Sequence, residues 1–362
     1  MIETDEVDIK CRKLIDNFQP FNAALEVTGR CNAQCGYCYI LREPPCADLS
    51  TEAIFRIIDK IDETGIFFVC ITGGEPFIRE DILDILSYLI KKDFFRFCIL
   101  TNGTLLTDEH IDFLVKNKNH VDFLRMSLFS HIDTIHDGYC GVENGLAKSI
   151  ANAEKLMAGG VKVLGIMNIL DINIDSFEQS WHYFSRMGFD MTIGLTKCAS
   201  QESYETTARP FTSKEFYTRI FSRMDPAMTS SFIESLDRRL SEPEKNPGIC
   251  SGLSNSISID YRGNVKPCLT FRNMVIGNAL GEKGLLDILR SSEDYRKLRS
   301  MNKNNIDKCR ECGFINFCDV CLGMLHSLHG KFNENPEQFC NFAHALNDFR
   351  IDQCSPNIFQ RQ

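Results

Sequence analysis

Short apolar runs alternate with helical patterns between residues 21 and 200. Six runs rich in β-branched and aromatic residues are expected to be strands, at 23–28, 67–72, 95–101, 122–129, 161–168 and 190–195. Between the second and third runs, apolar residues recur on one helical face, at Ile82, Ile85, Leu86 and Leu89. Thr107, which precedes two acidic residues, is typical of a helix N-cap. This alternation predicts an α/β fold with a parallel sheet, a partial (β/α)6 barrel of the TIM type.

The alternation stops near residue 200, and the chain is longer than a single core usually supports. A polar stretch with several helix formers follows, and then a segment rich in cysteine. We therefore expect an N-terminal extension at 1–20, a barrel core at 21–200, a helical bridge at 201–245, a small cysteine-rich α+β domain at 246–345 and a C-terminal tail at 346–362.

The amino-acid composition excludes some classes of binding partner. A net charge of −9 and a pI near 5.5 argue against nucleic acid or an anionic membrane surface as the main partner. No apolar run reaches the ~18 residues needed to span a bilayer, and the acidic start is unlike a signal peptide. We expect a cytoplasmic protein with a small or peptidic substrate. In a reducing compartment, clustered cysteines among the 17 present favour metal ligation over disulfides.

Three cysteines follow the first expected strand on one short loop: Cys31, Cys35 and Cys38. A [4Fe-4S] cluster normally takes four cysteinyl ligands, so a local group of three leaves one iron free for a non-protein ligand. A zinc knuckle is the simpler alternative. In a barrel of this type the site lies at the C-terminal ends of the strands, which is where this loop is expected.

A second motif, Thr72-Gly-Gly-Glu-Pro76, ends the second expected strand. Its two glycines would let the backbone approach a ligand closely, and Glu75 offers an acceptor for an ammonium group. Together with the cysteine triplet, this segment resembles the radical S-adenosylmethionine (SAM) superfamily. The resemblance implies that the open iron binds the amino and carboxylate groups of SAM. One electron then cleaves a carbon–sulfur bond and releases a 5′-deoxyadenosyl radical.

The same resemblance assigns cofactor-binding roles. Gly73, Gly74 and Glu75 would hold the methionine amino group, and Tyr37 would pack at the adenine. Ser127 matches a position that touches ribose, and Asn102 lines the same mouth. For Ser127 and Asn102, ordinary capping or turn formation is an equally good interpretation. The sequence assigns no catalytic acid or base beyond the cluster and the SAM site.

A second set of cysteines in the C-terminal part, with Gly263 among them, resembles the SPASM domain, which holds auxiliary [4Fe-4S] clusters. The resemblance implies one cluster on Cys309, Cys312, Cys318 and Cys340, and another on Cys250, Cys268 and Cys321. The gap between Cys318 and Cys321 is one residue shorter than in the family. The fourth ligand of the second cluster is either absent, which leaves an open iron, or distant, such as Cys354 or Cys198. A pair of zinc ribbons is the alternative.

Auxiliary clusters can accept an electron from a substrate radical, so we expect net oxidation. The resemblance to SPASM enzymes, and the segment from Ser127 to Gly141, imply oxidative modification of a ribosomally made peptide, with cross-linking as the expected outcome. A tetrapyrrole or sugar substrate is the alternative. Formylglycine formation is disfavoured because Leu269 stands where that branch has an acidic base. A non-catalytic zinc-binding module is the remaining alternative.

The expected partners follow from the same hypothesis. The cluster loop starts by residue 31, which leaves no space for a leader-binding domain before it, so we expect a separate leader-binding protein or a substrate without a leader. An external donor of the flavodoxin or ferredoxin type would supply the electron that cleaves SAM.

Overall fold

The computed structural model describes residues 13–14, 17, 19–38, 40, 47–92, 96–195, 213–225, 228–229, 250, 252–315, 318, 320–332 and 337–354, with backbone alone at 195, 252, 328, 338 and 351–354. Most of the expected N-terminal extension and helical bridge lie outside the described residues. Cys11, Cys46 and Cys198 lie outside them too, as does the side chain of Cys354.

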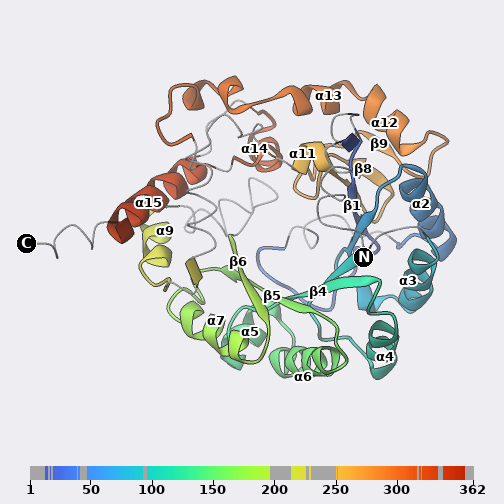
Figure 1. Cartoon of the computed structure of the whole chain (residues 1–362), viewed down its shortest axis with the longest axis horizontal. Helices are drawn as coiled ribbons and strands as arrows, with labels where there is room; N and C mark the ends of the chain where they lie inside the picture. Colours follow the sequence, from blue (N-terminus) through green and yellow to red (C-terminus); the bar gives the residue numbers. More distant parts are fainter. Residues whose placement is uncertain are drawn as a thin grey trace, which may run out of the picture.

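Six parallel strands form the first part of the molecule (Figure 1). They are β1 (Asn22–Glu26), β2 (Phe68–Thr72), β3 (Arg96–Thr101), β4 (Val121–Ser127), β5 (Val163–Ile169) and β6 (Asp190–Leu195). Each pairs in parallel with the next, in the order β6-β5-β4-β3-β2-β1. The prediction of an open (β/α)6 barrel is confirmed, with each strand within two residues of its expected bounds.

Helices cover the outer face of this sheet (Figure 1). They are α2 (Thr51–Glu63), α3 (Ile82–Ile90), α4 (Asp108–Lys116), α5 (Asp133–Cys140), α6 (Gly145–Ala158) and α7 (Phe177–Arg186), with the short 3-10 helix η2 (Pro76–Ile78) after β2. Thr107 caps α4 as predicted, because its side chain accepts a hydrogen bond from the His110 N–H.

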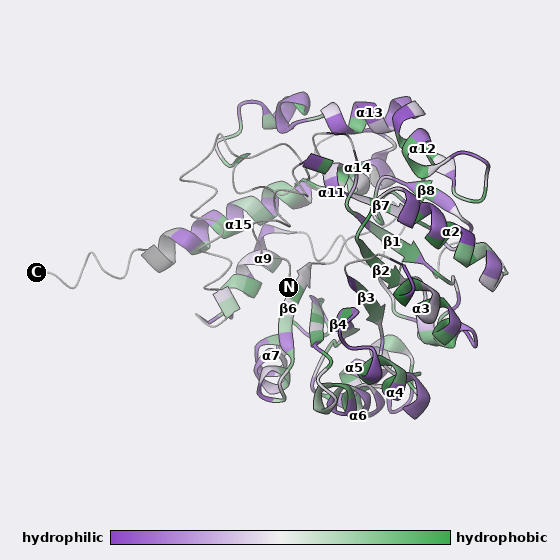
Figure 2. Cartoon of the chain, turned by 45° about the vertical axis from the view of Figure 1, so that its right-hand side comes forward, coloured by the Kyte–Doolittle hydropathy of each residue, from purple (hydrophilic) through white to green (hydrophobic). Residues whose placement is uncertain are grey.

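Alternation along the strands separates a helix-facing core from the inside of the barrel. In β2, Val69 and Ile71 are fully buried in the main core, against helical residues such as Ile54 and Ile85. Each such side chain contributes about 1.5–3 kcal/mol when it is removed from water. Figure 2 shows this pattern as hydrophobic residues along β1, β2 and β3, with mostly hydrophilic residues on the peripheral α13 (Glu293–Ser300).

The cysteine-rich segment continues the barrel sheet. Strand β7 (Ser256–Ile259) pairs in parallel with β1, and β8 (Asn264–Lys266) and β9 (Gly277–Asn278) follow antiparallel, which makes one nine-stranded sheet. Between β7 and β8, Gly263 adopts φ +80°, a left-handed turn conformation that favours glycine. The sequence predicted an α+β domain here. It did not predict that β7 would pair with β1, because local patterns do not reveal such pairing.

Seven further helices of this part of the molecule are described. They are α11 (Gly252–Asn255), α12 (Leu285–Ser291), α13, η6 (Lys303–Asn305), η7 (Asp307–Cys309), α14 (Leu322–His329) and α15 (Glu337–Cys354). From the expected bridge, α9 (Lys214–Phe221) lies beside α15 (Figure 1), where Phe221 packs against Phe342 and Phe349 at ring-centroid distances of 5.7 and 5.4 Å. Among the described helices, none has both the length and the apolar character to cross a membrane.

Candidate active site

The loop that carries Cys31, Cys35 and Cys38 leaves the C-terminal end of β1 and is held on two sides. On one side, the N–H groups of Gly74 and Glu75 donate to the carbonyl groups of Thr28 and Arg30 at 2.9 and 2.8 Å. On the other side, the Gln34 N–H donates to the Cys140 carbonyl at 2.7 Å, at the end of α5. The loop is therefore fixed between the segment after β2 and the helix after β4.

The two glycines of the second motif are required by this contact. Gly73 has φ +135°, and a Cβ there would lie 2.4 Å from the Thr28 carbonyl oxygen. A Cβ on Gly74 would lie 2.0 Å from the Arg30 carbonyl oxygen. Both distances are far inside van der Waals contact, so any side chain would push the cysteine loop away. The structure thus shows a close backbone approach to the cysteine loop, and the approach to a ligand stays a prediction.

Glu75 is fully buried and joins the ends of β2 and β3. Its Oε1 accepts from the Thr101 hydroxyl at 2.7 Å and from the Phe77 N–H at 3.2 Å, and its Oε2 accepts from the Asn102 N–H at 2.7 Å. Burial raises the pKa of this carboxyl to about 7. The structure therefore gives Glu75 three protein donors that the sequence did not predict. Its contact with an ammonium group stays a prediction.

Asn102 links β3 to the cysteine loop. Its Nδ2 donates to Asn32 Oδ1 at 2.9 Å and lies 3.9 Å from Cys31 Sγ, while its Oδ1 accepts from the Thr104 N–H at 2.9 Å. Turn formation and loop support are thus combined in one side chain. Ser127 is the last residue of β4, in register with Ile166 of β5, so it lies at the predicted end of the sheet.

The three loop thiols lie close enough to influence one another. Burial, with smaller contributions from neighbouring thiols, raises the pKa of Cys31 to about 11 and that of Cys35 to about 12. Cys38 contributes to both shifts. Three thiolates cannot share this site without a compensating cation, and metal binding displaces the protons. This donor set fits an iron–sulfur cluster with three protein ligands.

Aromatic rings pack behind the loop. The Tyr37 ring stacks on Tyr139 at 6.1 Å and meets the edge of Phe129 at 5.9 Å, and its hydroxyl interacts with Asn168. Burial raises the pKa of Tyr37, so the hydroxyl stays protonated. Tyr37 therefore lies between the cysteine loop, the end of β4 and α5.

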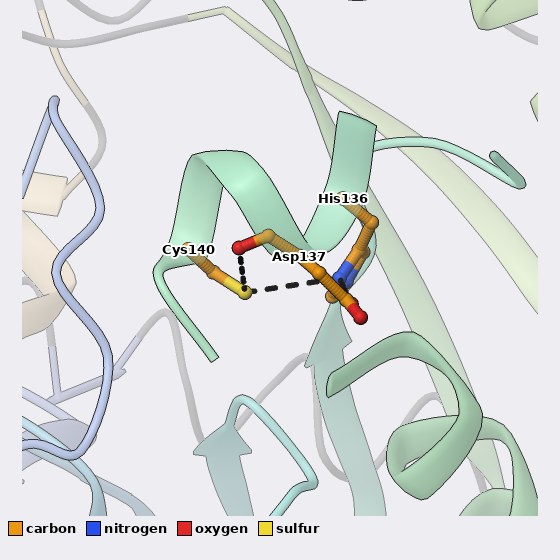
Figure 3. Close-up of side chains that lie close together, drawn as sticks. All are labelled: His136, Asp137 and Cys140. Carbon is orange, nitrogen blue, oxygen red and sulfur yellow. Dashed lines mark hydrogen bonds and ion pairs between the residues drawn. The ribbon is translucent and has the colours of Figure 1, made fainter. Parts of the chain in front are cut away.

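Helix α5 brings together three side chains that the sequence analysis did not single out (Figure 3). His136 Nδ1 lies 3.3 Å from Asp137 Oδ1 and 3.8 Å from Cys140 Sγ. Burial lowers the pKa of His136, which favours the neutral ring. Their types and spacing would suit a metal ion, but Asp137 Oδ1 already accepts from the Leu146 N–H at 2.8 Å. We interpret the group as a brace that ties α5 to α6, with Cys140 supporting the cluster loop. The spacing of four residues between His136 and Cys140 was the feature of the sequence that could have predicted this group.

The C-terminal cysteines form two groups. Cys309, Cys312, Cys318 and Cys340, the four expected to hold one cluster, all line a cavity of about 120 Å³. This space is larger than a single water molecule needs. The same cavity is lined by Lys303, Lys308, Phe314 and His344. Soft thiolate donors around such a space fit an iron–sulfur cluster.

The second group surrounds Thr270. The Thr270 hydroxyl lies 2.9 Å from Cys268 Sγ and 3.5 Å from Cys321 Sγ, and both Cys250 and Cys321 act electrostatically on Cys268. Thr270 can reach this position because residue 323 is glycine, where a Cβ would lie 2.2 Å from the hydroxyl oxygen. The three expected ligands are brought together, and Cys198 and the Cys354 side chain fall outside the described residues.

A buried ion pair connects the cysteine-rich part to the barrel. Arg272 Nη1 and Nη2 lie 2.5 and 3.3 Å from the two carboxylate oxygens of Glu26, the last residue of β1. The side chains of Arg272 and Glu26 are 4% and 0% exposed. The arginine thus contacts the last residue of β1, two residues before Thr28, where the contacts of the cysteine loop begin.

An open (β/α)6 barrel with a three-cysteine loop at its strand ends, followed by a domain with two further thiol groups, defines a class of iron–sulfur enzyme. Residues 25–183 match the radical SAM superfamily, and residues 250–313 match the iron-sulfur cluster-binding domain called SPASM. The chain therefore carries a radical SAM domain followed by a SPASM domain. Its cofactors are SAM, a [4Fe-4S] cluster in the barrel, and iron–sulfur clusters in the SPASM domain.

Two curated relatives are similar to this chain over most of its length. The antilisterial bacteriocin subtilosin biosynthesis protein AlbA of Bacillus subtilis is 25% identical over 83% of this chain and 67% of its own length. An AdoMet-dependent heme synthase of Nitratidesulfovibrio vulgaris is 24% identical over 88% of this chain and 91% of its own. The fold is shared with anSMEcpe with bound AdoMet and the Cp18Cys peptide, at a TM-score of 0.73 and 15% identity, over 92% and 97% of the two chains.

Proposed function

We propose that this enzyme uses SAM to modify a ribosomally synthesised peptide oxidatively, by forming a cross-link. The similarity to AlbA carries the proposal, because it extends over 83% of the chain, more than either matched domain alone. By its name, AlbA acts in the biosynthesis of the antilisterial bacteriocin subtilosin.

In this proposal, Cys31, Cys35 and Cys38 hold the cluster at which SAM binds. Gly73, Gly74 and Glu75 lie at the methionine amino group, Tyr37 at the adenine, and Asn102 and Ser127 at the same mouth. When bound, the cluster and SAM supply a 5′-deoxyadenosyl radical, which can abstract hydrogen from an unactivated carbon. The protein's own contribution is to fix the loop and to exclude water from it through the packing of Tyr37, Phe129 and Tyr139.

We propose that the C-terminal domain spans residues 246–345. Its two sets of cysteines would hold clusters that can accept electrons from the substrate. Cys309, Cys312, Cys318 and Cys340 would hold one auxiliary [4Fe-4S] cluster, and Cys250, Cys268 and Cys321 the other. Forming a cross-link by joining a side-chain atom to a carbon removes two hydrogen atoms. The radical would take one as part of 5′-deoxyadenosine, and an auxiliary cluster would supply an acceptor for the electron of the other, whose proton is released.

The proposal is tested with anaerobically reconstituted enzyme, SAM, a strong reductant and the candidate precursor peptide encoded beside the gene. We expect a mass loss of about 2 Da per cross-link, with release of 5′-deoxyadenosine. The matched control is the Cys31→Ala variant, which should yield neither product. Release of 5′-deoxyadenosine with unchanged peptide mass for every neighbouring precursor would contradict peptide modification.

A second candidate is oxidation of a tetrapyrrole, favoured by the similarity to the heme synthase over 91% of that protein. The same assay with a porphyrin substrate distinguishes the two candidates. The geometry adds no support for formylglycine formation, because Leu269 offers no base next to Cys268. An external electron donor of the flavodoxin or ferredoxin type, a separate leader-binding protein and a cytoplasmic location complete the proposal.

A further inference from the structure

A lysine is built into the wall of the four-cysteine cavity. Lys303 begins η6, its side chain is among the buried polar groups at 8% exposure, and its Nζ donates to the Ile315 carbonyl at 2.7 Å. Both Lys303 and Ile315 line the cavity that Cys309, Cys312 and Cys340 also line. Lysine is rarely buried to this extent, because removing an ammonium group from water is costly unless negative charge or hydrogen bonds compensate.

The cavity contains a second lysine in a different environment. Lys308 lines the same space but is exposed. Both ammonium groups line the same space as the four thiols and favour negative charge there, because opposite charges attract. The two ammonium groups therefore add positive potential at the place where thiolates gather.

The other auxiliary group is built differently. Next to Cys268 and Cys321 lies the neutral hydroxyl of Thr270, and the residue that makes room for it is Gly323. Potentials of iron–sulfur clusters depend on net charge, on hydrogen bonds to sulfur and on solvent exposure. A cluster with a buried ammonium beside it accepts an added electron more readily than one beside a hydroxyl.

We propose that the charge of Lys303 raises the reduction potential of the cluster on Cys309, Cys312, Cys318 and Cys340. This potential then lies above that of the cluster on Cys250, Cys268 and Cys321. This inference rests on the proposed ligand sets. The reduced form of the cluster carries one more negative charge than the oxidised form, and the fixed ammonium stabilises that charge. An electron removed from the substrate would then be more stable at the cluster next to Lys303 than at the other auxiliary cluster.

The test is a redox titration of the reconstituted enzyme, followed by electron paramagnetic resonance. The Cys312→Ala variant identifies which signal belongs to the cavity. Lys303→Gln keeps a hydrogen-bond donor but removes the charge, and Lys303→Arg keeps the charge. We expect Lys303→Gln to lower the reduced-to-oxidised ratio of this signal at a given potential by at least tenfold, equivalent to about 59 mV for one electron. Lys303→Arg should restore the wild-type value.

Lys308→Gln is the matched control, because it removes the same charge from the same cavity at an exposed position. Its effect should be less than half as large and should shrink at high salt, while the Lys303→Gln effect persists. Equal and salt-sensitive shifts for the two variants, or no shift for Lys303→Gln with the signal intact, would overturn the inference. Absence of the cavity signal from the wild-type enzyme would instead overturn the ligand assignment. Iron content and circular dichroism of each variant show whether it has folded.

Discussion

The ion pair between Arg272 and Glu26 makes a quantitative prediction about how the two parts of the chain are held together. The Arg272→Met change removes a guanidinium that is 4% exposed and leaves a carboxylate that is 0% exposed without it. Breaking a buried pair by removing one partner costs about 3–5 kcal/mol, because the remaining charge stays buried. We therefore expect the free energy of unfolding to fall by that amount.

The double variant Glu26→Leu with Arg272→Met separates charge from packing. When both charges are replaced by apolar groups, no buried carboxylate is left behind without the guanidinium, so the double variant should be within about 1 kcal/mol of the wild type or more stable. Lys155→Met serves as the control, since it breaks an exposed pair with Asp108 whose side chains are 53% and 83% exposed. That change should cost at most about 1 kcal/mol.

The assay is urea unfolding of anaerobic protein, with the three variants and the wild type measured side by side. Arg272→Met should have the lowest midpoint of the set. If its loss were no larger than that of Lys155→Met, or if the double variant were as unstable as the single one, the reasoning that a buried charge pair joins the SPASM domain to β1 would be refuted.

Three further predictions concern the site. Gly74→Ala should displace the cysteine loop and lower iron content from about 12 to about 8 per chain, while Gly138→Ala, where a Cβ would meet no atom within 4 Å, should leave it unchanged by iron analysis. Because burial raises the pKa of Glu75 from 4.5 to about 7, its protonated form stabilises the apoprotein below pH ~4.5, and about 3 kcal/mol is lost as pH rises through 7. A free energy of unfolding that does not change with pH in the wild type, or the same pH dependence in Glu75→Gln as in the wild type, would contradict this. Cys312→Ala should still cleave SAM but form no product, and normal turnover by this variant would exclude the electron-acceptor role.

The barrel was predictable because its information is local. Each strand of the core is a short apolar run, and the polar cap at Thr107 marks a helix start by its own side chain. The cysteine groups were predictable for a similar reason, since their spacing resembles known cluster domains. The position of β7 beside β1 was not, because pairing between segments more than 200 residues apart leaves no mark on either strand alone.

The supporting residues of the site were the least predictable. The need for glycine at position 74 arises from the Arg30 carbonyl, and the role of Glu75 from donors on β3, so neither follows from the motif itself. Arg272 and Lys303 are not among the motif cysteines of the SPASM domain, and their importance comes from burial in the folded chain. His136 and Cys140 carried a helical spacing, but the Gln34 contact to the Cys140 carbonyl needed the structure.

The central claim is that the three-cysteine loop holds a cluster with an open iron that binds and cleaves SAM. Its most direct test is iron, sulfide and zinc analysis of anaerobically reconstituted protein, together with 5′-deoxyadenosine release under strong reductant. The account predicts about 12 irons per chain, about four fewer in Cys35→Ala, and nucleoside release from the wild type alone. Colourless protein with bound zinc, or a full set of clusters that never releases the nucleoside, would contradict it.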